Sequence, residues 1–370
     1  MSNQYDDDSD DSQTVRYEIE RRRRRTLAMK KKRKRQILKR KIMLFVGAAA
    51  VLAASVSMSS AVRRKNTVSG SSMNAKETLQ VSMEKTAEEN NASVNIEDTA
   101  PKFDYASKSG NYVEITDEAV RTPYVALLDV DNNSIIAGRG SDETIYPASM
   151  TKIMTLIVAV ENLDDMSRMY RFTNDLLYPL YLAQASVAGF SADEIVTVKD
   201  LLYGMVLPSG ADAAVALAQL VAGSEEEFAV LMNEKCEELG LTHTHFTNAT
   251  GLYDEQQYTT PSEMAMIMKY AMEDPVCANV LSTFQYTTEK TSQHPDGILL
   301  TSTMFSRMYG TEVEGVTITA GKTGYTDEAR NCLVSYAVKG DRHYICVTAF
   351  ASNKWHCVFD SFEIYGNYLP

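Results

Sequence analysis

Histidine, cysteine and tryptophan are scarce in this 370-residue chain, which has five histidines, five cysteines and one tryptophan. No C-x-x-C pair and no zinc-ligand spacing occurs among them, and the odd cysteine number fits no disulfide framework, so we expect no metal and no cofactor. No Gly-x-Ser-x-Gly motif surrounds a serine, which argues against a Ser-His-Asp hydrolase. A phosphate-binding loop is missing too, because Val316 stands where Gly-x4-Gly-Lys-Thr requires its first glycine.

The formal net charge of −12 conceals a strong asymmetry. Residues 1–65 hold 18 of the 37 basic side chains and 7 of the 49 acidic ones. The remaining 19 basic and 42 acidic side chains give the rest of the chain a net charge of −23. Because such a surface repels a phosphate backbone, we predict no nucleic-acid partner. For the basic run alone, a nuclear-localisation or RNA-binding arm is the alternative.

The basic run ends where an uncharged apolar stretch begins, at residues 42–62. About 20 apolar residues can cross a bilayer, and a positive cluster marks the cytoplasmic side of such a span. The sequence therefore predicts a cytoplasmic head over 1–41, a transmembrane helix over 42–62 and the remainder outside the cell. Since Ser59-Ser60-Ala61 resembles a cleavage site, a cleaved signal peptide and a secreted protein are the alternative.

A polar stretch separates the apolar segment from a folded domain. Residues 63–118 are rich in Ser, Asn, Lys and Glu, which predicts a flexible extracellular linker, and the domain is expected over 119–370. Strand character lies at both ends of the domain and helical periodicity in its middle, which predicts an α+β fold whose first hairpin pairs with the last strands in an antiparallel sheet. The expected strands are 124–130, 134–138, 315–320, 331–338 and 343–349, and the expected helices are 151–163, 199–206, 211–222, 224–239, 262–272 and one running toward Tyr368.

A candidate nucleophile and its base lie three residues apart in Pro147-Ala148-Ser149-Met150-Thr151-Lys152. Because a helix should begin here, this spacing places the Ser149 hydroxyl and the Lys152 amine on one face. A lysine can take the proton of a serine once burial or a second cation lowers its pKa. The pattern alone is weak, since Ser82-Met83-Glu84-Lys85 also matches it within the predicted linker.

Two further polar segments complete the candidate site. Leu207-Pro208-Ser209-Gly210 is a helix-breaking loop with a third hydroxyl, from Ser209. Gly321-Lys322-Thr323-Gly324-Tyr325 ends a β-branched strand, where a lysine charge, a threonine hydroxyl and closely approachable glycine backbone can together hold a carboxylate. If each segment is considered alone, Ser209 would be interpreted as a helix cap and Lys322 as an exposed lysine at the end of a strand.

In the order Ser-x-x-Lys, Ser-Gly-x, Lys-Thr-Gly, these segments resemble the penicillin-recognising serine enzymes, specifically the low-molecular-mass D-alanyl-D-alanine carboxypeptidases. The resemblance covers roughly residues 120–350 and includes 146–155, 244–248, Gly251-Leu252 and 321–326. It implies a β-lactamase/transpeptidase-like fold, in which an antiparallel sheet is flanked by helices and joined by an all-helical subdomain.

The same resemblance implies a serine-type D-Ala-D-Ala carboxypeptidase of the bacterial cell membrane, with peptidoglycan stem peptides as substrate and β-lactams as inhibitors. Its catalytic residues would be Ser149 as nucleophile, Lys152 as base and Ser209 as proton donor to the leaving amine. Its substrate-binding residues would be Lys322, Thr323, Gly324 and Tyr325. The Tyr325 backbone amide would complete an oxyanion hole with that of Ser149.

One departure from the family pattern concerns its second motif, usually Ser-x-Asn, because Ala211 stands in the place of the asparagine. In the family, the missing amide is expected to orient the motif lysine and to contact a substrate carbonyl. A catalytically weakened wall protein that binds D-Ala-D-Ala or β-lactams is therefore an alternative function. A β-lactamase-like hydrolase is another, although Glu161-Asn162-Leu163 lacks the continuation that its glutamate loop requires.

Overall fold

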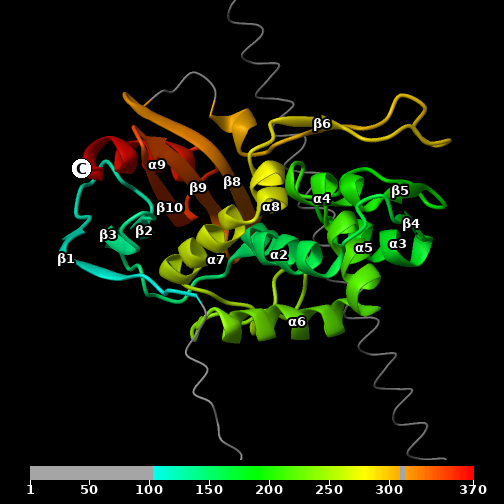
Figure 1. Ribbon diagram of the computed structural model, residues 1–370, viewed down its shortest axis with the longest axis horizontal. Helices are drawn as coiled ribbons and strands as arrows, with labels where there is room; N and C mark the ends of the chain where they lie inside the picture. Colours follow the sequence, from blue (N-terminus) through cyan, green and yellow to red (C-terminus); the bar gives the residue numbers. More distant parts are fainter. Residues whose placement is uncertain (1–102, 309–312) are drawn as a thin grey trace, which may run out of the picture. The chain divides into compact units, whose positions relative to one another are not determined.

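A six-stranded sheet with helices on both faces organises residues 103–308 and 313–370, the parts of the chain that the computed structural model describes (Figure 1). The strand order is β1-β3-β2-β10-β9-β8. The strands are β1 (Ser107–Glu114), β2 (Tyr124–Asp129), β3 (Ser134–Arg139), β8 (Val316–Thr326), β9 (Arg330–Lys339) and β10 (Arg342–Ala351). The predicted head at 1–41, the predicted span at 42–62 and the predicted linker as far as residue 102 lie outside the described residues.

The sheet is mixed, which corrects the prediction of a purely antiparallel one. Strand β1 runs parallel to β3, whereas the other neighbouring pairs in this sheet are antiparallel. Sequence reasoning missed β1 because six of its eight residues are exposed, so it resembles the polar linker predicted over 63–118. Regular structure is therefore present before residue 119, where the domain was expected to begin. The expected pairing of the first hairpin with the last strands is confirmed, with Leu128 of β2 opposite Ile345 of β10.

Strand β2 is apolar on both sides because helices cover both faces of the sheet. Successive side chains of a strand point to opposite faces. Val125 and Leu127 pack in one apolar cluster with Ile364 and Tyr365 of helix α9 (His356–Tyr368), whereas Leu128 belongs to the larger cluster of the other face. Figure 1 shows α9 on one side of the sheet and α2 (Lys152–Asn162) with α7 (Pro261–Glu273) on the other.

The part of the chain between β3 and β8 is mostly helical. Its centre is α5 (Ala211–Ala222), an alanine-rich helix whose small side chains let neighbouring helices approach closely. The other described elements here are α3 (Asn174–Ala183), α4 (Val198–Val206), α6 (Glu225–Glu238), α8 (Pro275–Leu281), two pairs of short antiparallel strands, β4 (Met169–Arg171) with β5 (Ile195–Thr197) and β6 (Gln285–Thr287) with β7 (Leu299–Thr301), and the 3₁₀ helices η1 (Ala148–Thr151) and η2 (Phe305–Arg307). The strand pair β4–β5 corrects the prediction of an all-helical subdomain. No sign of these strands appears in the sequence, because three residues are too few to show a period of two.

The predicted helices all occur, within one or two residues of their expected bounds. The predicted strand at 315–320 extends as β8 to Thr326, through the Lys-Thr-Gly segment. All five cysteines are buried and unpaired. Within 103–308 and 313–370, no helix is long and apolar enough to cross a membrane.

Candidate active site

Ser149 lies in the 3₁₀ turn η1, which leads directly into helix α2. Residues three apart are stacked in a 3₁₀ turn, so Lys152 lies over Ser149. The Lys152 Nζ donates to the Ser149 Oγ at 3.1 Å and also to the Thr250 carbonyl oxygen. The structure thus brings together the hydroxyl and the amine of the Ser-x-x-Lys motif.

The electrostatic setting of Lys152 favours a neutral amine. Its side chain is buried, and burial lowers its pKa from the usual 10.5 to about 8, against the opposing effects of Glu225 and Asp212. A neutral amine has a lone pair that can accept the Ser149 proton, while its two N–H groups remain donors. The lysine is therefore able to act as a base near neutral pH.

Ser209 and Lys322 form a second serine–lysine pair. The Lys322 Nζ donates to the Ser209 Oγ at 2.9 Å and to its neighbour's carbonyl, that of Thr323, at the same distance. Burial, reinforced by the charges of Lys152 and Arg307, holds the pKa of Lys322 well below its usual range. Lys322 is not an exposed lysine at the end of a strand, because its side chain is buried. Ser209 is not the cap of α5, because Gly210 holds that position.

The segment after Lys322 packs directly against the turn that carries the nucleophile. A Cβ on Gly324 would lie 2.9 Å from the Pro147 carbonyl oxygen and 3.1 Å from the Ser149 nitrogen, so only glycine allows this approach. The Thr323 hydroxyl lies 2.8 Å from that of Thr303, a residue that sequence reasoning missed. The Tyr325 side chain is 58% exposed and points to solvent, where its hydroxyl donates to Asp327.

A loop at residues 247–252 supplies the remaining neighbours of the nucleophile. The Asn248 Oδ1 accepts from the Thr250 and Gly251 amides, at 3.2 and 2.8 Å. Gly251 has φ +74°, and a Cβ there would lie 2.0 Å from the Ala148 carbonyl oxygen. The sequence held a signal for this loop, because an asparagine side chain often binds the backbone two residues further on in a tight turn, and Gly251 follows Asn248 at a distance of three. The sequence contains no comparable signal for the contact between the Thr250 carbonyl and Lys152.

Because residue 211 is alanine, helix α5 offers Lys152 no side-chain amide at this position. The Ala211 side chain is buried, and its backbone nitrogen donates to the Ser186 carbonyl at 2.8 Å. The next residue, Asp212, is also buried but accepts from the Ala188 amide at 2.8 Å, away from the motif lysines. Among the described residues, the hydrogen-bond acceptors of the Lys152 amine are therefore the Ser149 hydroxyl and the Thr250 carbonyl.

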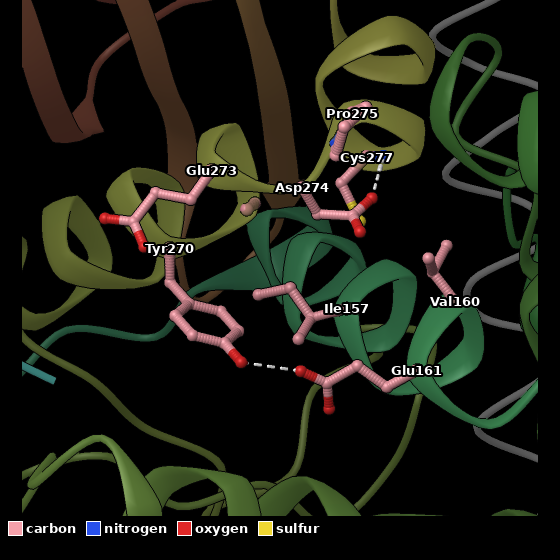
Figure 2. Close-up of a pocket in the computed structure, with 9 residues that line it drawn as sticks. Ile157, Val160, Glu161, Tyr270, Glu273, Asp274, Pro275 and Cys277 are labelled. Atoms are coloured by element: carbon pink, nitrogen blue, oxygen red, sulfur yellow. Dashed lines mark hydrogen bonds between the residues drawn. The ribbon is translucent and has the colours of Figure 1, made fainter. Parts of the chain in front are cut away.

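A separate cavity of about 250 Å³ lies toward the far end of α2, between this helix, α7 and α8 (Figure 2). Part of its polar lining is already committed: Glu161 accepts from the Tyr270 hydroxyl at 2.7 Å, and Asp274 caps α8. None of the candidate site residues lines it. Within the described ranges, no group of three His, Cys, Asp or Glu side chains could hold a metal ion.

Comparison with known proteins places this arrangement in a family. The family profile described as D-alanyl-D-alanine carboxypeptidase, peptidase family S11, matches residues 112–353. This chain belongs to that family. The match includes both serine–lysine pairs and the loop at 247–252. The order and spacing of the motifs predicted this relationship from the sequence, and the profile match confirms it.

Curated members of the D-alanyl-D-alanine carboxypeptidase family are similar over the same part of the chain. DacF of Bacillus subtilis (strain 168) is 36% identical over 234 residues, which are 61% of this chain and 56% of DacF. DacC of Escherichia coli (strain K12) is 34% identical over 229 residues, or 60% of this chain and 54% of DacC. The chain thus spans little more than half the length of these two relatives.

Solved structures of the family share the fold. The Streptomyces K15 DD-transpeptidase has a TM-score of 0.61 at 26% identity, covering 69% of this chain and 100% of that one. A D-alanyl-D-alanine carboxypeptidase from Mycobacterium tuberculosis H37Rv has a TM-score of 0.60 at 25% identity, covering 71% and 96%. The fold is therefore the α+β, DD-transpeptidase-like one, with a mixed sheet and helices.

Proposed function

We propose that this chain is a serine-type D-Ala-D-Ala carboxypeptidase that shortens peptidoglycan stem peptides through an acyl-enzyme on Ser149. The observation that carries the proposal is the contact between the Ser149 hydroxyl and a buried lysine amine whose pKa is lowered to about 8. Such an amine can serve as general base for a hydroxyl near neutral pH. Membership of the carboxypeptidase family supports the same activity.

In the acylation step, the Ser149 Oγ attacks the carbonyl of the penultimate D-alanine, and its proton goes to the Lys152 Nζ. The C–N bond then breaks, the proton held by Lys152 passes through the Ser209 hydroxyl to the leaving amine, and free D-alanine departs. The 2.9 Å hydrogen bond from Lys322 orients this hydroxyl. Water then attacks the ester and releases the shortened peptide.

The substrate would lie along strand β8, beside residues 316–320. This strand is at the edge of the sheet, where a peptide can add as a further strand. Lys322 and Thr323 would hold the terminal carboxylate. The oxyanion would lie between the backbone amides of Ser149 and Tyr325, donors that need no reorganisation during the reaction. The close approach of Gly324 to the Ser149 amide is consistent with that pair.

A β-lactam mimics the terminal dipeptide and should acylate the same serine, then leave slowly. Slow release would separate this activity from that of a β-lactamase-like hydrolase, which turns its β-lactam over. Ala211 supports a second candidate, a weakened wall protein that binds D-Ala-D-Ala without cleaving it, because Lys152 has no side-chain amide partner among the described residues.

For the location, we propose a single-pass protein of the bacterial cell membrane with its N-terminus in the cytoplasm. The basic residues of 1–41 and the apolar stretch at 42–62 support it. The catalytic domain would then lie outside the cell, where its peptidoglycan substrate is. Secretion after cleavage of the apolar stretch is the alternative, and the N-terminal residue of the mature protein distinguishes the two.

The deciding experiment measures D-alanine release from a synthetic peptide ending in D-Ala-D-Ala. The full chain should release D-alanine, and Ser149→Ala should abolish the release. Ser82→Ala, in the second Ser-x-x-Lys match, is the matched control and should behave like the unchanged chain. A folded chain that binds the peptide but releases nothing would favour the binding protein, and equal release by Ser149→Ala would exclude Ser149 as nucleophile.

A further inference from the structure

The backbone amides and carbonyls of Ala249 and Thr250 are all hydrogen-bonded to side chains. The Ala249 amide donates to the Glu225 Oε1 at 3.0 Å, and its carbonyl accepts from the Thr155 hydroxyl at 2.7 Å. The next carbonyl, that of Thr250, accepts from Lys152. The partner of the lysine is thus a backbone atom whose position depends on three side chains, Glu225, Thr155 and, through the Thr250 amide, Asn248.

Glu225 is unusual among these side chains because it carries a charge. It is the first residue of α6, which begins after the capping residue Ser224, so the start of the helix fixes its backbone. Its carboxylate is largely withdrawn from solvent, which raises its pKa, and makes no ion pair with a described lysine, arginine or histidine. When the Lys152 amine is protonated, its positive charge stabilises the Glu225 carboxylate and lowers the pKa of that carboxyl.

The charged groups around Lys152 come from three elements. Lys322 on β8 has the same sign, and the charge of Lys152 lowers the pKa of Lys322. Asp212 on α5 has the opposite sign, but its carboxylate is committed to the amides of Ala188, Gly189 and Ala213. Glu225 on α6 has the larger effect of the two carboxylates on the Lys152 amine. It is therefore the main group that favours a proton on this lysine.

We propose that Glu225 is a positioning residue with two roles: it holds the Thr250 carbonyl against the Lys152 amine, and its negative charge stabilises that amine after it takes the Ser149 proton. The inference rests on the proposed function for its second role. It follows from contacts on opposite sides of one short loop, since Glu225 fixes the Ala249 amide and the following residue contacts the lysine. The residue itself touches neither substrate nor nucleophile.

Two variants separate the roles. Glu225→Gln keeps a carbonyl oxygen for the Ala249 amide but removes the charge, whereas Thr155→Val removes a hydrogen bond to the same residue and leaves all charges in place. Glu226→Gln is the matched control, because it removes a charge from the adjacent, exposed position of the same helix. The measurement is the rate of acylation by a fluorescent penicillin as a function of pH, with the full chain.

A negative neighbour raises the pKa of an amine, so its removal should lower the pKa of Lys152. We expect the rising, acid limb of the pH profile to move to lower pH by about one unit in Glu225→Gln, the low end of the effect of a nearby opposite charge. The rate on the plateau should fall, because a weaker base removes the proton less well. Thr155→Val should lower the rate without moving the limb, and Glu226→Gln should change neither.

A direct titration keeps the inference testable if the chain is not an enzyme. In protein labelled with ¹³C at the lysine Cε, the Lys152 resonance, assigned by its loss in Lys152→Arg, reports the charge of the amine. Its midpoint should be lower in Glu225→Gln than in the unchanged chain or in Glu226→Gln. Absence of acylation in the unchanged chain would overturn the proposed function alone. An unchanged Lys152 midpoint in Glu225→Gln would overturn the inference, whatever the activity.

Discussion

The Lys322 Nζ donates to the Ser209 Oγ over 2.9 Å, so each of the two serines of the site has its own buried lysine. The two amines repel one another, and the charge of Lys152 contributes to the lowered pKa of Lys322. Without a bound anion, the site therefore holds its protons weakly. A carboxylate bound beside Lys322 would reverse this, since an opposite charge favours the protonated amine.

Binding of the substrate carboxylate should therefore be coupled to uptake of a proton. At a pH above the lowered pKa of free Lys322 and below its raised pKa in the complex, the amine gains a proton as the peptide binds. Calorimetry of Ser149→Ala with a peptide ending in D-Ala-D-Ala, in two alkaline buffers of different ionisation enthalpy, measures it. Lys322→Arg, which stays charged, should take up no proton at this position. Equal binding enthalpies in both buffers would contradict the prediction.

Ser209→Ala should reduce D-alanine release by about 10²-fold or more, since a positioned general acid contributes at least that much. The fold should be little affected, because the Ser209 side chain does not cap α5. Release is measured beside the melting temperature of the same protein. A variant that keeps its melting temperature and loses less than tenfold in release would show that another group protonates the leaving amine.

Gly251→Ala should disable the site. Its positive φ and a Cβ only 2.0 Å from the Ala148 carbonyl oxygen require the turn that carries Ser149 to move. Gly223→Ala is the control, because Gly223 has a similar φ of +85° but nothing within 4 Å of its added Cβ. Both variants carry the strain of a left-handed alanine, about 1 kcal/mol or more. Acylation by fluorescent penicillin should be lost in Gly251→Ala alone, and equal loss in both would mean that backbone strain, not the contact, is responsible.

The sequence was sufficient to predict the elements with a strong period and the polar motifs that end them. Lys152 could be placed over Ser149 because a spacing of three within a helical turn fixes their contact. The pairing of β2 with β10 followed from the need to bury two apolar strands at opposite ends of the domain. These predictions depend on local geometry or on simple burial.

Contacts between backbone atoms and distant side chains could not be predicted in the same way. The Thr250 carbonyl is 98 residues from Lys152, and any residue type offers the same carbonyl there. Glu225 and Thr303 are ordinary surface-type residues in the sequence, and only the fold brings them to the site. Strand β1 was missed because its polar side chains reflect an edge position, where pairing needs no apolar face.

Ala211→Asn tests whether the missing amide limits the reaction. Lys152 has two acceptors among the described residues, the Ser149 hydroxyl and the Thr250 carbonyl, so an Asn amide oxygen would add a third. A hydrogen bond to a charged group stabilises by about 1.5–3 kcal/mol, which corresponds to an increase in D-alanine release of about tenfold or more if it is made only as the lysine becomes charged. Ala211→Leu adds a side chain of similar size without an amide and should give no increase. If the Asn variant folds and releases D-alanine at the unchanged rate, the chain has adapted to alanine at this position and the weakened-protein alternative loses its basis.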